Sequence, residues 1–380
     1  MQKGLAKMTR LVKVSGRGDG IDWKSALKNL EPDDVLLLAP RFYELDQGLE
    51  VNNITIKGTG NTPEETVING FFVLESNCDF FTLENVSLQT KSDHNTIYVE
   101  DDADTYLTLR NTTLYGDEND MAAIAVNGKC TLELFSSKIL NSSISLFAQA
   151  DFSLTMSDSV VDYDSKDYAA VGIQGKGTAI ISNSIIRGNL STYPSSNSEV
   201  DLNSSSISYG LIHGQTWVNM LNSTVEKNDD SSFYVSDDSW VNIVQSEFRG
   251  GIFLDKNTRT LIQNSKIDRL IACDNAKVTL NNSTILSHTD FQDNASGDAT
   301  RVAFSGRDEF EYFLALNGHA SLSGRDLIIN PNGSTLAVQD DAKIKLNIVS
   351  SSDKDLEVEC NSRPNVNILG MRWEAKKNND

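Results

Sequence analysis

The 380-residue sequence has little of several features that would assign a protein class at once. It has only six prolines, too few for a proline-rich disordered chain. No apolar run approaches the length of a membrane-spanning helix, and residues 1–20 lack the apolar segment of a signal peptide. As written, the sequence predicts a cytoplasmic protein. A secreted or cell-surface protein whose leader has been removed is the alternative.

Cysteine and basic side chains are scarce as well. The four cysteines (Cys78, Cys130, Cys273 and Cys360) lie far apart, without metal or redox spacing, so we interpret them as small apolar core residues. Lys and Arg number 33 against 53 Asp and Glu, which gives a formal charge of −20. Such a chain is a poor partner for nucleic acid or an anionic membrane. We therefore expect no nucleic-acid partner and no membrane span.

What the sequence does contain is a repeat. The stretch IAVNGKCTLELFSSKIL at 124–140 combines two alternating apolar runs, a polar turn and a third run after SS. Related windows recur at intervals of 18–26 residues, with one last interval of 44. Spacings of this size indicate stacked coils. The windows begin at Phe81, Leu107, Leu132, Leu154, Ala179, Val200, Val218, Val241, Thr260, Val278 and Leu322.

The fifth residue of each window is typical of a sharp turn, because Asn and Asp tolerate left-handed backbone angles and bond locally. Stacked amides at this position are also expected to form a hydrogen-bonded ladder. Three short strands per coil, completed by neighbouring coils, predict an all-β fold: a right-handed parallel β-helix of about a dozen coils. The turn residues are Asn85, Asn111, Ser136, Asp158, Asn183, Ser204, Asn222, Gln245, Asn264, Asn282 and Asp326.

The ends of such a stack need covering. Residues 21–30 (IDWKSALKNL) place Ile21, Ala26, Leu27 and Leu30 on about one helical face and predict a short N-terminal capping helix. We therefore expect an N-terminal segment and cap at 1–32, the β-helix at 33–370 with an insertion at about 286–313, and a C-terminal tail at 371–380.

Residues 33–70 (DDVLLLAPRFYELDQGLEVNNITIKGTGNTPEETVING) resemble the opening of pectin-lyase-like right-handed β-helices, and of pectin methylesterases in particular. The coil repeat extends the resemblance along most of the chain. It implies a fold shared by lyases, hydrolases, esterases and adhesins. The methylesterase signatures Q-D-T-L, D-F-I-F-G and G-R-P-W are absent, as are the pectate-lyase and polygalacturonase sets. The resemblance therefore implies no particular reaction.

In similar β-helices the ligand lies on the sheet that precedes the Asn turn. Projecting the repeat gives that sheet an amide-rich column and a partly aromatic one, which suit the hydroxyls and apolar faces of a sugar chain or simply a stable strand surface. A second candidate region is the presumed insertion, where two arginines lie beside aromatic residues. The predicted ligand-binding residues are Gln149, Gln174, His213, Tyr234, Phe253, Asp255, Arg301 and Arg307.

The acidic residues give no predicted catalytic centre. Glu100 and Asp255 are the only acids in the projected sheet, roughly 30 Å apart at the strand spacing, whereas paired-carboxylate hydrolysis needs about 10 Å or less. The doublets Asp101-Asp102, Asp237-Asp238 and Asp340-Asp341 occupy positions where other coils have Asn-Gly, so a turn role is favoured.

The loops after the third strand carry further acids. They include Asp93, Asp117, Glu118, Asp120, Asp162, Asp164, Asp167, Glu226, Asp229 and Asp230. Such a ridge is suited to Ca²⁺ or to a solvated rim, but no segment has a calcium-loop spacing. We predict no metal site and no cofactor, with Ca²⁺ the one alternative.

The sequence thus favours a non-catalytic β-helix that binds a polysaccharide or glycan. One alternative is a carbohydrate-active lyase, hydrolase or esterase acting on a pectin-like or other acidic polysaccharide. A structural, adhesin-like scaffold is the other.

Overall fold

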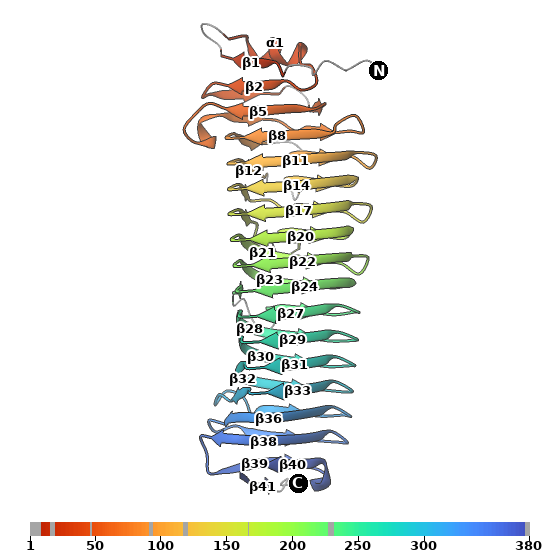
Figure 1. Cartoon of the computed structure of the whole chain (residues 1–380), viewed down its shortest axis with the longest axis vertical. Helices are drawn as coiled ribbons and strands as arrows, with labels where there is room; N and C mark the ends of the chain where they lie inside the picture. The colour runs from red at the N-terminus through yellow and green to blue at the C-terminus, as the bar shows by residue number, and fades with distance from the viewer. Residues whose placement is uncertain are drawn as a thin grey trace, which may run out of the picture. The chain divides into compact units, whose positions relative to one another are not determined.

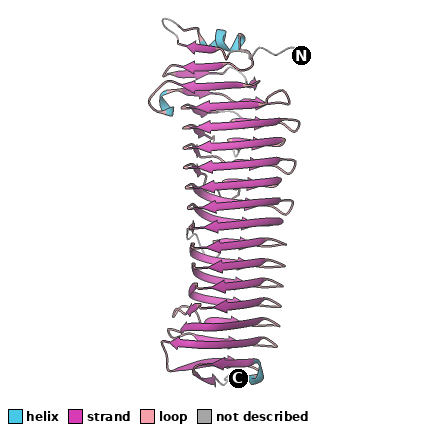
Figure 2. Ribbon diagram, viewed as in Figure 1, coloured by secondary structure: helices cyan, strands magenta, loops and turns pink. Residues whose placement is uncertain are grey.

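The computed structural model describes residues 9–376, except 16–19, 46–47, 91–93, 117–120, 166 and 227–231. Nearly all regular structure in these residues is β-strand, as Figure 2 shows. The strands pair in parallel between successive coils, which confirms the predicted parallel β-helix and is consistent with the pectin-lyase-like resemblance. Helices in the described residues are short, and none has the length and apolar character needed to cross a membrane. The chain divides into two units, Met1–Asn189 and Leu190–Asp380.

From β4 onward, each coil of the first unit contributes one strand to each of three sheets, in chain order first, second and third. Figure 1 labels many of these strands. Alternation buries every second side chain: Leu132 and Leu134 are fully buried, while Thr131 and Glu133 face outward. In the described part of this unit, the first sheet consists of β4 (Leu49–Val51), β7 (Phe72–Leu74), β10 (Ile97–Val99), β13 (Ile124–Val126), β16 (Ile144–Leu146) and β19 (Val171–Ile173).

The other two sheets of the first unit flank the Asn turn. The second sheet consists of β1 (Leu11–Val14), β2 (Val35–Leu38), β5 (Ile54–Gly58), β8 (Phe80–Glu84), β11 (Asp104–Arg110), β14 (Lys129–Phe135), β17 (Asp151–Ser157) and β20 (Lys176–Ser182). The third consists of β3 (Phe42–Glu44), β6 (Val67–Asn69), β9 (Ser87–Gln89), β12 (Thr113–Tyr115), β15 (Lys138–Leu140), β18 (Val160–Asp162) and the start of β21 (Ile185–Thr192).

The second unit has the same three sheets but shorter coils. In four places the third strand of one coil runs directly into the first strand of the next, so four strands serve both sheets: β23 (Ser206–Ile212), β28 (Glu247–Leu254), β30 (Lys266–Ala272) and β32 (Thr284–Phe291). Register shifts at Phe248/Gly251 and Ile267/Arg269 make the bend between the two halves of β28 and β30. These bends replace the longer loops of the first unit.

The remaining strands of the second unit each belong to one sheet, apart from two long ones. Its first sheet also includes β26 (Phe233–Val235), β35 (Tyr312–Leu316), β37 (Thr335–Val338), β39 (Asp355–Cys360) and β41 (Arg372–Lys376). Its second sheet consists of β22 (Asn197–Asn203), β24 (Gln215–Leu221), β27 (Trp240–Val244), β29 (Arg259–Gln263), β31 (Lys277–Asn281), β33 (Ser296–Thr300), β36 (Ser321–Asn330), β38 (Lys343–Ser351) and β40 (Val366–Leu369). The third sheet adds β25 (Thr224–Val225) and β34 (Ala303–Ser305), and β36 and β38 run on into it.

The turn between the second and third sheets has the predicted backbone. All eleven turn residues read from the repeat have φ between 46° and 55°, in the left-handed region. Arg301, which the repeat did not include, occupies the same turn between β33 and β34, with φ of 54°. The predicted amide ladder is present only as separate pairs: Asn111 Nδ2 donates to Asn85 Oδ1 at 2.8 Å, and Asn282 Nδ2 to Asn264 Oδ1 at 2.6 Å.

A buried ladder does follow this turn, and it is made of serine. In the second unit, the backbone N–H of one serine donates to the hydroxyl of the serine in the next coil at 3.1 Å, through Ser205, Ser223, Ser246, Ser265 and Ser283. Each of these side chains is at most 5% exposed. Each hydroxyl also donates to the carbonyl two residues before it, at 2.7–3.0 Å. The hydroxyls thus satisfy backbone groups inside the coil.

Three expectations about the chain's organisation need correction. The presumed insertion at 286–313 is a coil, because β33 pairs in register with β31 and β36, and β34 pairs with β32 and β36. Part of the presumed tail at 371–380 is β41, which pairs with β39. The described residues hold eight second-sheet strands in the first unit and nine in the second, more than the dozen coils expected.

The predicted capping helix is present as α1 (Trp23–Lys28), drawn at the N-terminal end of the first unit in Figure 1. Asp22 caps it by accepting the Ser25 N–H at 3.0 Å. Trp23 and Ala26 are its buried residues, whereas Ile21, expected on the packed face, is 43% exposed. The centroids of the Trp23 and Tyr43 rings lie 5.2 Å apart, and Trp23 Nε1 donates to the Glu44 carbonyl at 2.8 Å. Two single-turn 3₁₀ helices, η1 (Pro63–Glu65) and η2 (Arg363–Asn365), complete the described elements.

Candidate functional site

The first sheet of the second unit carries two outward columns of side chains. Parallel register places Leu211, Tyr234, Phe253 and Ile271 in one column, because β23, β26, β28 and β30 pair without a shift at these residues. The other column lies two residues further along each strand and contains His213 and Asp255. These are the columns that the sequence repeat projected, and four of the predicted binding residues lie in them.

The aromatic members of this face are packed against one another. The Tyr234 and Phe253 rings stack with centroids 5.5 Å apart and an interplanar angle of 18°. The His213 imidazole lies 5.4 Å from the Tyr234 ring. All three side chains are partly exposed. The result is a short aromatic strip that crosses neighbouring coils and faces outward.

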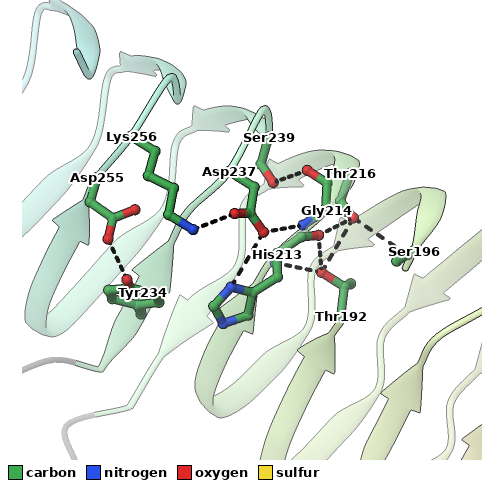
Figure 3. Close-up of polar contacts among 10 residues, drawn as sticks. All are labelled: Thr192, Ser196, His213, Gly214, Thr216, Tyr234, Asp237, Ser239, Asp255 and Lys256. Atoms are coloured by element: carbon green, nitrogen blue, oxygen red, sulfur yellow. Dashed lines mark hydrogen bonds and ion pairs between the residues drawn. The ribbon is translucent and has the colours of Figure 1, made fainter. Parts of the chain in front are cut away.

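The His213 backbone is held by the side-chain hydroxyls of two threonines, as Figure 3 shows. The Thr192 hydroxyl donates to the His213 carbonyl and accepts the His213 N–H, both at 2.8 Å. The Thr216 hydroxyl donates to the same carbonyl at 2.8 Å. These bonds fix the strand end from which the imidazole projects.

Asp237 joins His213 to the next coils. Its carboxylate accepts the Gly214 N–H at 2.9 Å and lies 3.7 Å from His213 Nδ1 and 2.6 Å from Lys256 Nζ (Figure 3). The hydrogen bond from Lys256, followed by that from Gly214, holds the pKa of Asp237 below its usual range. With φ of 64°, Asp237 also makes the turn that was predicted for the acidic doublets.

Asp255 has one satisfied and one unsatisfied oxygen. The Tyr234 hydroxyl donates to Oδ2, while Oδ1 is buried and has no hydrogen-bond partner among the described residues. A buried carboxylate oxygen without a donor is costly. This oxygen has almost no exposed surface, so a ligand hydroxyl can bond it only if the side chain turns it toward the outer face.

Sequence reasoning missed a second acid of the same kind. Asp290 lies in the Tyr234 column, directly after Ile271, and Gln292 lies in the Asp255 column. Gln292 Nε2 donates to Asp290 Oδ2 at 2.5 Å, and Asp290 Oδ1 is buried and has no partner in the described structure. Burial raises the pKa of Asp290. The residue escaped detection because its coil was interpreted as an insertion.

The two carboxylates do not form a hydrolytic pair as they stand. Two coils separate the Asp255 and Asp290 backbones, about 10 Å along the stack at the strand spacing. Asp255 bonds Tyr234, which lies in the coil on the side away from Asp290. The side chain therefore increases a separation that already lies at the upper end of the range for glycoside hydrolysis.

The other predicted binding residues lie elsewhere. Gln149 and Gln174 belong to the first unit, where Gln149 is exposed in a turn after β16 and Gln174 is partly exposed after β19.

The two arginines are not a pair. Arg301 occupies the left-handed turn after β33 and is exposed. Arg307 lies beyond β34, where its guanidinium bonds the buried Asp268 carboxylate at 2.7 Å and lies 3.6 Å from Glu309. The Arg307 side chain thus compensates a buried charge. Its predicted ligand role stays a prediction. The nearby Phe310 ring stacks on His288 at 5.2 Å.

The acidic ridge can be followed only in part. Asp93, Asp117, Glu118, Asp120, Asp229 and Asp230 lie outside the described residues. Of the others, Asp162 pairs with Arg187 at 3.0 Å, and Glu226 pairs with Arg249. The described residues contain no group of three or more His, Cys, Asp or Glu side chains placed to hold a metal ion. The prediction of no metal site and its alternative, Ca²⁺ in these loops, both stay untested.

No family model matches the chain, and no curated relative matches it. Among solved structures it is similar to the catalytic unit of a thermostable GH87 α-1,3-glucanase from Streptomyces thermodiastaticus, with 10% identity and a TM-score of 0.35. That match covers 90% of this chain and 63% of the glucanase unit, so the chain spans less than two thirds of it. It is also similar to the PL6 family alginate lyase AlyGC, with 10% identity, a TM-score of 0.26 and coverage of 93% and 80%.

Proposed function

We propose that the first sheet of the second unit binds an uncharged polysaccharide, without catalysis. The observation that carries this proposal is the combination, on one outward face, of a stacked aromatic strip with two carboxylates that each keep one buried oxygen unpaired. Sugar rings offer both complements: C–H faces that pack on aromatic rings, and hydroxyls that donate to carboxylates.

The charge of the face selects against acidic polymers. Asp255 and Asp290 both belong to this outward face, and Lys256, a cation beside Asp255, is engaged with Asp237. An acidic polysaccharide would bring further negative charge to two carboxylates with incomplete hydrogen bonding, which is unfavourable. A neutral hydroxyl-rich chain carries no such penalty.

The arrangement also supports binding over hydrolysis. A glycoside hydrolase needs one carboxyl as acid and a second as base or nucleophile within about 10 Å, with the substrate between them. On this face, Asp255 bonds Tyr234 on the side away from Asp290. In the proposed binding mode, each carboxyl group turns its unpaired oxygen outward and accepts a sugar hydroxyl, at separate points along a chain.

The test is a binding titration with cellohexaose, mannohexaose and a hexamer of galacturonic acid. We expect a neutral saccharide to bind more tightly than the acidic one. Tyr234→Ala and Phe253→Ala should each weaken that binding by about 1–3 kcal/mol through lost stacking area. Tyr106→Ala is the matched control: Tyr106 is 61% exposed on the second sheet of the first unit. Unchanged affinity in the double variant would refute the proposed site.

Turnover is checked in the same samples. Asp255→Asn should alter affinity modestly, and product analysis should detect no cleavage with either protein. Cleavage by the native protein that disappears in Asp255→Asn or Asp290→Asn, with folding intact, would show instead that the face is an active site.

A further inference from the structure

A groove of about 500 Å³ runs along the corner between the second and third sheets of the second unit. One wall is formed by the left-handed turn residues Asn222, Gln245, Asn264 and Asn282. The opposite wall is the first position of the third-sheet strands, where register aligns Thr224, Glu247, Lys266 and Thr284. The buried serine ladder forms the floor. The groove thus crosses the coils at right angles to the strands.

The hydrogen-bonding groups of the groove are only partly used within the protein. Asn282 bonds Asn264 at 2.6 Å, and Asn222 bonds the Ser204 hydroxyl at 3.2 Å. Gln245 lies between these two bonded positions, and its own side chain has no hydrogen bond among the described residues. Its amide and the hydroxyls of Thr224 and Thr284 are therefore available to a ligand, at intervals of about one or two coil spacings of 4.8 Å.

The groove is also electrically neutral. Its one charged pair, Lys266 and Glu247, has Nζ and Oε1 3.6 Å apart. The remaining lining side chains are amides and hydroxyls, which both donate and accept. Such a surface suits a partner that is itself both donor and acceptor and carries no charge.

The same corner of the first unit differs in its strand wall. The equivalent third-sheet positions there are Thr113, Lys138, Val160 and Ile185, so two of four are apolar and the lysine has no opposite charge in register. The fold alone therefore does not require a polar wall at this corner. The second unit has one.

We infer that this corner groove is a second binding site of the protein, for an uncharged hydroxyl-rich chain such as a neutral oligosaccharide laid along the coils. The chain would exchange groove water for direct hydrogen bonds to Gln245, Thr224 and Thr284. The Asn264–Asn282 pair lies on one side of Gln245 and the Asn222–Ser204 bond on the other. The inference goes beyond the proposed first-sheet site, because it lies on another face and uses no aromatic platform.

The experiment titrates cellohexaose and mannohexaose into a Tyr234→Ala/Phe253→Ala double variant, in which the first-sheet site is removed. We expect this protein to retain one binding event. Adding Gln245→Gly and Thr284→Val should weaken that event roughly 10-fold or more, since each lost hydrogen bond lowers affinity by about 2- to 13-fold. Glycine accepts the left-handed angle of Gln245, and valine keeps the shape of threonine, so the coil is preserved.

The matched control is Ser136→Gly, which makes a similar change at the equivalent turn of the first unit, where φ is 49°. It should leave affinity unchanged. If the double variant binds neither saccharide, or if the groove substitutions leave its binding unchanged, the second site is refuted while the first-sheet site can stand. If Tyr234→Ala/Phe253→Ala binds as the native protein does and only the groove substitutions weaken binding, the proposed first-sheet function fails and the groove remains.

Discussion

Replacing Ser246 by alanine tests the buried serine ladder at its centre. Ser246 is 4% exposed, and its hydroxyl donates to the Val244 carbonyl at 2.8 Å while accepting the Ser223 N–H at 3.1 Å. The substitution removes both bonds and leaves the Ser223 N–H buried without a partner. An orphaned buried donor costs about 1–3 kcal/mol and each lost bond about 0.5–1.5 kcal/mol, so we expect a loss of about 2–4 kcal/mol.

Two measurements check this value. Urea unfolding should give the loss in free energy, and hydrogen exchange should show reduced protection at the Ser223 amide in particular. Ser153→Ala, an exposed strand serine of the first unit, is the control and should change stability by less than about 0.5 kcal/mol. If Ser246→Ala unfolds as the native protein does and keeps its protection at Ser223, the ladder contributes nothing and the reasoning is wrong.

Three further substitutions follow from the structure. Asn282→Val should lower stability by about 1–2 kcal/mol and Asn282→Gly by less, because valine resists the φ of 48° that glycine accepts; equal melting temperatures would contradict this. Asp290→Asn should stabilise the protein near neutral pH, because burial raises the pKa of Asp290 and the native carboxyl group therefore lowers protein stability as pH rises through its folded pKa. In melting curves, the stabilising effect of the substitution should vanish below about pH 3.9, where the carboxyl group is protonated in both the folded and the unfolded protein. Arg307→Met should cost about 3–5 kcal/mol, because Asp268 is left buried beside only Arg269 at 3.9 Å, while saccharide affinity should not change.

The repeat could be predicted because its signals are local. A left-handed turn selects Asn or Asp whatever lies around it, and period-two alternation identifies the buried side chains within five residues. For this reason the sheet order and the columns through Tyr234 and Asp255 followed from spacing alone. The buried ladder did not, although Ser follows the turn residue from Ser137 to Ser283 in eight consecutive windows. The sequence thus contains the serine signal, but the ladder was predicted for the amides of the preceding turn residues instead.

Long-range contacts were the part that the repeat could not provide. Arg307 and Asp268 are 39 positions apart in the sequence, and nothing in either segment shows that a buried acid needs an arginine from another coil. The coil containing Asp290 was lost for a related reason. Its second-sheet strand, Ser296–Thr300, has the pattern SGDAT with glycine and alanine inward, too weak an apolar signal to register as a strand.

The weak strand Ser296–Thr300 also affects the candidate face, because the packing of its coil positions Asp290 on the first sheet. Gly297 lies against the Phe291 ring and Leu322, so its small size leaves space that larger neighbours fill. Phe291 is the inward residue that immediately follows Asp290 on β32. The coil therefore keeps its core through Phe291 while its second-sheet strand lacks apolar bulk. Asp290 is held next to Ile271 in the Tyr234 column, with one oxygen unpaired. Gly297→Val would give this strand the apolar pattern of the other second-sheet strands, but its side chain would clash with Phe291. It should disturb the strand that carries Asp290 and weaken saccharide binding on the first sheet, whereas the corner groove at Gln245, which uses earlier coils, should keep its affinity.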